Sequence, residues 1–155
     1  MNKENIIDIR KLSQKYAYTS IQMHESIARN AGFSATDHKY LGFFLQKGNL
    51  TAGELAELTG LTTGAITGLI DRFEKKNLVK RQFDSSDRRK VIIVPDSKKI
   101  IKLFEPYYKE FQTETEKLIA SFSLEEIKII EAFILKSIEL MNDTNKKIKS
   151  QAYVK

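Results

Sequence analysis

With 155 residues, of which 41% are hydrophobic, the chain is long enough for one globular domain, or for one domain with an oligomerisation arm. It contains no cysteine, which excludes a disulfide framework, a thiol-based redox sensor and a cysteine-ligated zinc site. The sequence has no long apolar run and no signal-peptide pattern, so we expect a cytoplasmic protein with no membrane partner. The net charge of +6 suits a surface that binds a polyanion.

The N-terminal part of the chain is expected to be helical. Apolar residues recur at spacings of three, four and seven over residues 4–30, which predicts an amphipathic helix. A second helix is expected to begin after Ser34, its N-cap, and to run to about Gln46, because Gly48 and Asn49 follow. Two helices therefore precede the most informative segment of the chain.

Two shorter helices are predicted next. Thr51 and Glu54 have the spacing of a capping box, which marks the start of the first. Gly60 ends that helix, and Thr62 is expected to cap the second, which runs to about Asn77, a residue that tolerates the left-handed conformation of a helix end. Two helices joined through so short a corner are typical of a helix-turn-helix.

The sequence pattern then changes from helix to strand. Residues 78–83 and 90–95 are rich in β-branched and aromatic residues and flank the segment DSSDRR. This arrangement predicts a β-hairpin with a polar tip.

Two further helices are predicted in the C-terminal part. One begins near Asp96 and Ser97, and Pro106 lies inside its apolar stripe, where it is expected to kink the helix or to shift its start. Ser123 and Glu126 form another capping box, which predicts the start of the last helix.

The spacing of small and apolar residues in the middle of the chain fits the packing of a helix-turn-helix. Ala56 is small where the second helix crosses the first, and Gly60 permits the corner. The angle is expected to be closed by apolar residues from both helices, namely Leu55, Leu61, Ile66 and Leu69. The outer face of the second helix then presents Thr62, Thr63, Gly64, Thr67, Gly68, Asp71 and Arg72.

Two glycines on this outer face carry a helix-propensity cost of roughly 1 kcal/mol each relative to alanine. Our hypothesis is that Gly64 and Gly68 leave the helix backbone free to approach DNA closely. The threonine hydroxyls would then reach phosphates, and their methyl groups would contact thymine. The alternative is that both glycines are tolerated surface residues in a helix held by tertiary contacts.

The centre of the chain is basic, since residues 62–94 hold eight Lys or Arg against four Asp or Glu. Arginines at the hairpin tip suit a narrow minor groove, whereas the alternative is an ordinary charged turn. The predicted wing contacts are Arg81, Asp87, Arg88, Arg89 and Lys90, with Asp87 pairing with an arginine to hold the tip in shape. Lys75, Lys76 and Lys80 are expected to contact phosphates.

These motifs together resemble the MarR family of winged helix-turn-helix transcriptional regulators. The resemblance depends on ELAELTGLTTGAITGLIDRFEKKNLVKR followed at once by DSSDRRKVIIV, and the order of helices extends it over nearly the whole chain. Two departures are visible. Asn77 replaces the family's usual glycine, and residues 94–97 replace its Leu-Thr-x-x-Gly, which leaves the start of the next helix open.

The expected fold is mainly α with a small β-hairpin wing (α+β), a winged helix-turn-helix with a helical dimerisation region from both chain ends. The resemblance implies a homodimer, and the long apolar stripes at both ends agree with it. The expected parts are an N-terminal dimerisation helix (1–33), the DNA-binding domain (34–95), C-terminal dimerisation helices (96–145) and a disordered basic tail (146–155). The dimer would read a pseudo-palindrome with half-sites about one DNA turn, roughly 34–36 Å, apart.

The resemblance also implies release of DNA by a small aromatic or anionic effector. Residues expected to line such a site are Tyr16, Met23, His24, Phe43, Phe44, Phe104 and Tyr108, although aromatic stripes at helical spacing are usually core. The only histidines are His24 and His38, so we predict no metal site and no cofactor.

The sequence favours a sequence-specific regulator of double-stranded DNA, more readily a repressor than an activator. The alternative is an interaction module whose basic face binds an acidic protein partner, because fold alone does not fix function. An enzyme is not expected, since no Ser-His-Asp set, phosphate-binding glycine loop or placed carboxylate pair is visible.

Overall fold

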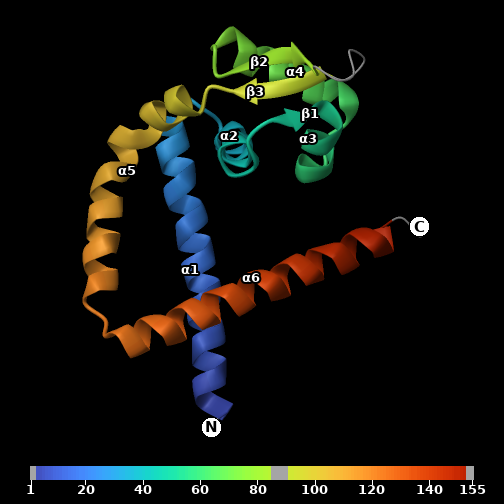
Figure 1. Cartoon of the computed structure of the whole chain (residues 1–155). Helices are drawn as coiled ribbons and strands as arrows, with labels where there is room; N and C mark the ends of the chain where they lie inside the picture. The colour runs from blue at the N-terminus through green and yellow to red at the C-terminus, as the bar shows by residue number, and fades with distance from the viewer. Residues whose placement is uncertain (1–2, 85–90, 153–155) are drawn as a thin grey trace. The chain divides into compact units, whose positions relative to one another are not determined.

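The computed structural model describes residues 3–84 and 91–152 of the chain. The predicted tip of the wing, with Asp87, Arg88, Arg89 and Lys90, lies outside the described residues. The backbone divides into two compact units, Met1–Tyr108 and Lys109–Lys155, and each is treated by itself. Figure 1 gives the order of the elements along the chain.

The first unit begins with two helices whose ends agree with the predictions. Helix α1 spans Lys3–Asn30 and α2 spans Ala35–Lys47. Ser34 is the N-cap of α2, and its hydroxyl accepts a hydrogen bond from the backbone N–H of Asp37 at 3.0 Å. Gly48 ends α2 with a φ of 75°, a value that glycine adopts without strain.

The helix-turn-helix is formed by α3 (Ala52–Thr59) and α4 (Thr63–Lys75). The predicted capping box is present, because the N–H of Glu54 donates to Thr51 Oγ1 and a Glu54 carboxylate oxygen accepts from the N–H of Thr51 at 2.7 Å. Gly60 takes the left-handed conformation at the end of α3, and Thr62 caps α4. Asn77 follows α4 with a φ of 55°, which confirms the predicted end of this helix.

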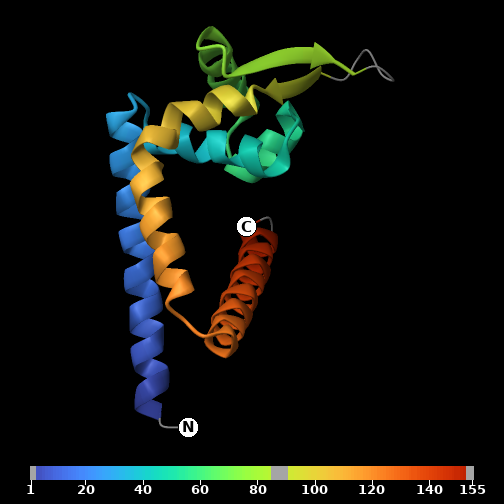
Figure 2. The same ribbon diagram turned by 60° about the vertical axis from the view of Figure 1, so that its left-hand side comes forward.

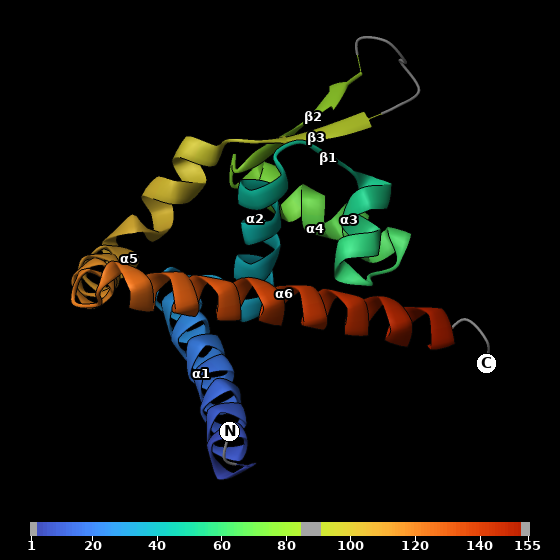
Figure 3. The same cartoon turned by 60° about the horizontal axis from the view of Figure 1, so that its bottom comes forward.

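The wing is built on a three-stranded antiparallel sheet in the order β1-β3-β2. Strands β2 (Val79–Phe83) and β3 (Val91–Pro95) confirm the predicted hairpin. They run side by side and extend away from α4 (Figures 2 and 3). Strand β1 (Leu50–Thr51), which pairs with β3, was not predicted, because two residues give no periodic signal.

The core of the first unit collects one apolar face from each of its elements. Leu41 and Phe44 of α2, Leu55 of α3 and Ile93 of β3 are almost completely buried. The buried residues of α4 are Ile66, Leu69, Ile70 and Phe73. Leu61, predicted to help close the corner, is half-buried and packs against this core. Because the four buried residues of α4 face the core, the opposite side of α4 is exposed to solvent.

Helix α5 (Ser97–Ala120) begins where the sequence predicted, so neither Pro106 nor the changed residues after the wing shift its start. The side chain of Asp96 caps it by accepting a hydrogen bond from the N–H of Lys99 at 3.0 Å. Pro106 lies inside the helix, where a proline removes one backbone hydrogen bond. The boundary between the two units falls within α5.

Helix α6 (Leu124–Ala152) opens with the predicted capping box, in which the N–H of Glu126 donates to Ser123 Oγ at 3.3 Å. The expectation of a disordered tail from residue 146 differs from the structure, because α6 continues through residues 146–152. Lysine, glutamine and alanine favour helix, and no glycine or proline interrupts residues 146–152. No helix in the described part of the chain is long and apolar enough to cross a membrane.

Candidate nucleic-acid interface

One face of α4 is open, and we call it the recognition face: Thr62, Thr63, Gly64, Thr67, Gly68 and Asp71. Its members are exposed or half-buried, while Ile66, Leu69, Ile70 and Phe73 on the opposite side are buried. The sequence predicted this division, because the apolar residues of the helix-turn-helix leave no other side free. The structure therefore brings the predicted residues of α4 to one surface.

Within residues 3–84 and 91–152, no packing contact requires glycine at two positions of the recognition face. A Cβ added to Gly64 or Gly68 would meet no atom within 4 Å, and neither residue has a positive φ. Their cost in helix propensity is therefore not compensated by close packing within the chain. This observation supports the hypothesis that the backbone of α4 is kept bare for an external partner.

Hydrogen bonds within α4 decide what the threonines offer to a ligand. Thr62 Oγ1 accepts from the N–H of Ala65 at 3.4 Å, so its own proton stays available for donation. Thr67 Oγ1 donates to the carbonyl of Thr63 at 3.1 Å. Thr67 therefore presents an acceptor lone pair and a methyl group outward, a combination suited to base edges rather than to phosphate.

Arg81 of β2 joins the wing to the recognition helix. Its guanidinium donates to Asp71 Oδ1 at 2.6 Å and to Glu74 Oε2, and its backbone N–H donates to Glu74 Oε1 at 2.9 Å. The hydrogen bond that the guanidinium donates to Asp71, followed by the hydrogen bond to Glu74 and its charge, raises the pKa of Arg81. The sequence predicts Arg81 as a DNA contact. In the structure both terminal nitrogens of its guanidinium donate to carboxylates of α4, so Arg81 holds strand β2 of the wing against the recognition helix.

We expect the ion pair between Arg81 and Asp71 to make a small but measurable contribution to the free energy of unfolding. Because Asp71 and Arg81 are partly exposed, their interaction free energy should be about 0.5–1 kcal/mol and should fall as salt is raised. A double-mutant cycle with Asp71→Asn and Arg81→Gln, measured by urea unfolding, checks the value. Zero coupling at low salt would show that the wing is held by the sheet and core alone.

The other basic residues differ in their surroundings. Arg72 Nη2 lies 2.8 Å from Asp37 Oδ1, so it ties α4 to α2. Lys76 Nζ lies 4.3 Å from the ring centre of Phe33, a cation–π contact. Lys75 and Lys80 are exposed. The exposed Lys75 and Lys80 agree with the predicted phosphate contacts. Arg72 and Lys76 would have to bind phosphate in addition to their contacts within the protein.

A chain of polar and aromatic side chains connects α1, α2 and α5 within the first unit. The hydroxyl of Tyr108 contacts His24 Nδ1 and lies 3.1 Å from His38 Nε2. The ring of Phe104 meets that of His38 edge-on, with centres 4.7 Å apart. We call His24, His38, Phe104 and Tyr108 the histidine–tyrosine cluster. Since a phenol has one proton, at most one imidazole can accept it, and at least one must donate to the phenol oxygen.

The seven residues predicted to line an effector site do not all come together. His24, Phe104 and Tyr108 belong to the histidine–tyrosine cluster, and Met23 packs against the neighbouring core. Phe44 is a completely buried core residue, and Tyr16 is 78% exposed. Phe43 stacks on Tyr40 with ring centres 6.2 Å apart. His38 also belongs to this cluster, although the sequence suggests it only as a possible metal ligand. Its contact with Tyr108, 70 positions away, leaves no signal in the sequence.

Acidification is expected to destabilise the first unit through His38. Burial, together with repulsion from His24, lowers the pKa of His38 below its usual 6.5. Between the lowered value and 6.5, the unfolded chain binds more protons than the folded chain, so stability falls as pH drops through this window and levels off below it. Urea unfolding from about pH 8 to about pH 5 measures this loss. The loss of stability on acidification should be smaller in the His38→Gln variant. The same pH profile in that variant as in the wild type would contradict a role for His38.

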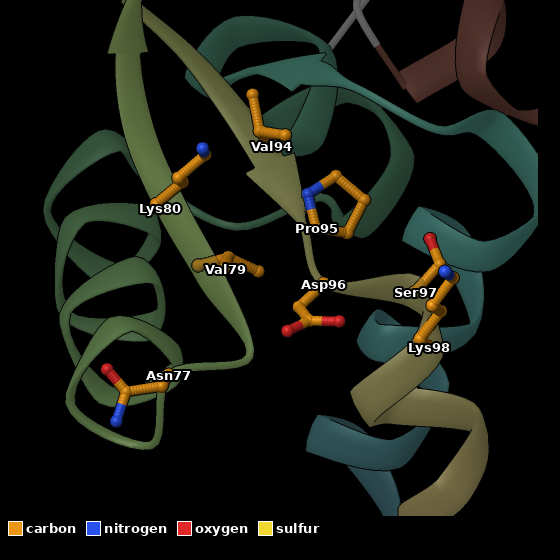
Figure 4. Close-up of a pocket in the computed structure, with 8 residues that line it drawn as sticks. All are labelled: Asn77, Val79, Lys80, Val94, Pro95, Asp96, Ser97 and Lys98. Carbon is orange, nitrogen blue, oxygen red and sulfur yellow. The ribbon is translucent and has the colours of Figure 1, made fainter.

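A shallow depression of about 520 Å³ lies at the base of the wing. Figure 4 shows its lining: Asn77, Val79, Lys80, Val94, Pro95, Asp96, Ser97 and Lys98. It contains none of the predicted effector residues. In the described part of the chain, no group of three or more His, Asp or Glu side chains is placed to hold a metal ion.

Comparison with known proteins agrees with this architecture. The model of the MarR family matches residues 33–91. The chain is 37% identical over 142 residues to the uncharacterised HTH-type transcriptional regulator YcgE of Bacillus subtilis, and the match covers 90% of each protein.

Solved structures extend the likeness to the fold. A MarR family protein from Bacillus stearothermophilus superposes with a TM-score of 0.70 at 28% identity, covering 92% of this chain and 99% of that one. A mutant of Staphylococcus aureus MepR bound to an oligodeoxyribonucleotide has a TM-score of 0.55 at 22% identity, over 86% of this chain and 97% of its own.

Proposed function

The chain belongs to the MarR family of winged helix-turn-helix transcriptional regulators, and we propose that it is a repressor that binds a pseudo-palindromic DNA operator as a homodimer. The observation that supports this most directly is the bare recognition face of α4 beside a wing anchored by Arg81. A surface open at two glycines, next to basic residues, suits the close approach of a duplex.

Homodimerisation is supported by the second unit. None of the described side chains between residues 109 and 150 is buried in the single chain. Many of them are large and apolar, including Phe111, Leu118, Ile130, Phe133, Ile134, Ile138 and Met141. A helical unit with so much exposed apolar surface gains most by pairing with a second copy, and twofold symmetry is the commonest outcome.

We further propose that a small-molecule effector acts through the histidine–tyrosine cluster. Its residues come from α1, α2 and α5, so a small aromatic or anionic compound that disturbed Tyr108 would act on three helices at once. The similar protein YcgE is named a transcriptional regulator, which agrees with a binding role rather than a catalytic one.

Selection from a pool of random duplexes tests the function. We expect recovery of a twofold-symmetric motif whose half-sites are about one helical turn apart. Binding should weaken steeply with salt, because each phosphate contact releases counterions. Selection without enrichment would contradict DNA recognition and would favour the alternative, an acidic protein partner for the basic face.

A further inference from the structure

The wing carries an exposed apolar pair that the proposed function does not yet use. Phe83, at the end of β2, is 69% exposed, and Val91, its partner across the ladder, is 36% exposed. A single exposed apolar side chain is normal on a protein surface, but two that adjoin form a small apolar patch, a feature that can mark a binding site. The two lie together, since residues directly opposite in an antiparallel pair have neighbouring side chains.

The strand register decides which way this pair faces. Side chains alternate along a strand, so Val79, Arg81 and Phe83 share one face of the hairpin. Val79 is buried, and Arg81 on the same face reaches Asp71 of the recognition face at 2.6 Å. Phe83 lies two residues, about 7 Å, farther along this face than Arg81. The apolar pair therefore continues the surface that begins with the recognition face.

We propose that Phe83, supported by Val91, packs against the deoxyribose edge of the DNA minor groove and supplies a part of duplex affinity that does not depend on salt. This rests on the proposed function. Apolar side chains on minor-groove proteins contact sugars and base steps in this way, next to basic residues that neutralise phosphates. Lys80, the neighbour of Arg81 on the opposite face of β2, is such a basic residue.

The position of the pair favours DNA over a protein partner. Arg81, on the same face of β2 as Phe83, donates to Asp71 of the recognition face at 2.6 Å, so the apolar pair is continuous with the surface proposed to bind the duplex. The two side chains are too small to form an interface of their own, since a stable protein interface needs about 800 Å² on each side. They therefore act as one part of that larger surface.

The salt dependence of binding separates an apolar contact from an ionic one. The dissociation constant of the full chain for the selected duplex is measured by fluorescence anisotropy from about 50 to about 200 mM salt. Phe83→Ala is expected to weaken binding about tenfold at every salt concentration, with an unchanged salt slope. Phe83→Leu should recover most of the loss. Lys80→Ala, the matched ionic variant, should reduce the slope by about 0.9.

Hydroxyl-radical footprinting supplies a second measurement. Phe83→Ala should lose protection of sugars only where the wing meets the minor groove, while protection over the recognition helices persists. Wild-type binding with an unaffected Phe83→Ala variant, or a changed salt slope in that variant, would overturn this inference alone. Failure of the wild type to bind any duplex specifically would instead overturn the proposed function, and this inference with it.

Discussion

Replacing Gly68 with leucine is expected to abolish operator-specific binding while the protein remains folded. A Cβ at this position meets no atom within 4 Å, and leucine favours helix over glycine, so we expect the variant to fold. A leucine there would hold the backbone of α4 away from the base edges. Losing the contacts of two base pairs costs about 3 kcal/mol, so the dissociation constant should rise by at least about 100-fold. Gly64→Leu should behave in the same way.

Alanine substitutions separate helix stability from DNA binding. Gly68→Ala is expected to raise the free energy of unfolding by about 0.4–1 kcal/mol, because it removes a flexible residue from the interior of a helix. Gly42 of α2 is the matched control, since a Cβ added there also meets no atom within 4 Å. Gly42→Ala should give a similar gain in stability without loss of affinity, whereas Gly68→Ala should lose affinity. Equal operator affinity in Gly68→Leu and the wild type would show that close backbone approach is irrelevant.

Features controlled by local sequence were predictable. Ser34, Thr51 and Thr62 begin helices because their hydroxyls accept hydrogen bonds from N–H groups three residues later. Gly60 and Asn77 end helices because they adopt positive φ. These devices act within one turn, so a single sequence contains the whole signal, and the helix-turn-helix could be placed before its packing was known.

Features that depend on distant residues were not predictable. The partners of Arg81 lie on α4 and become neighbours only after the chain reverses into β2. His38 meets Tyr108 only when α2 packs on α5. Phe44 was expected at an effector site but is buried in the core, because a helical stripe does not say which part of it a neighbouring helix covers. Side-chain partnership across elements requires the packed fold.

Ile134→Asp is expected to dissociate the proposed homodimer. Ile134 belongs to an apolar stripe of α6 with helical spacing, formed by Ile127, Ile130, Ile134, Ile138 and Met141. It is 50% exposed in the single chain, so an interface between copies would bury it. A carboxylate in an apolar interface loses its hydration without a partner, and the dimer dissociation constant should rise by at least about 100-fold. Sedimentation equilibrium measures the change.

The adjacent residue provides a matched control. Leu135 is 54% exposed but lies on another side of α6, next in sequence to Lys136 and one turn from Glu131 and Glu139. Leu135→Asp should therefore leave the dimer intact, although the introduced charge is the same. Operator affinity should fall only in Ile134→Asp, because a monomer holds one half-site. Dissociation of both variants would show that the interface extends around α6 to the side of Leu135, whereas a stable Ile134→Asp dimer would contradict an interface formed by this stripe of α6 and leave α1 or the end of α5 to join the two copies.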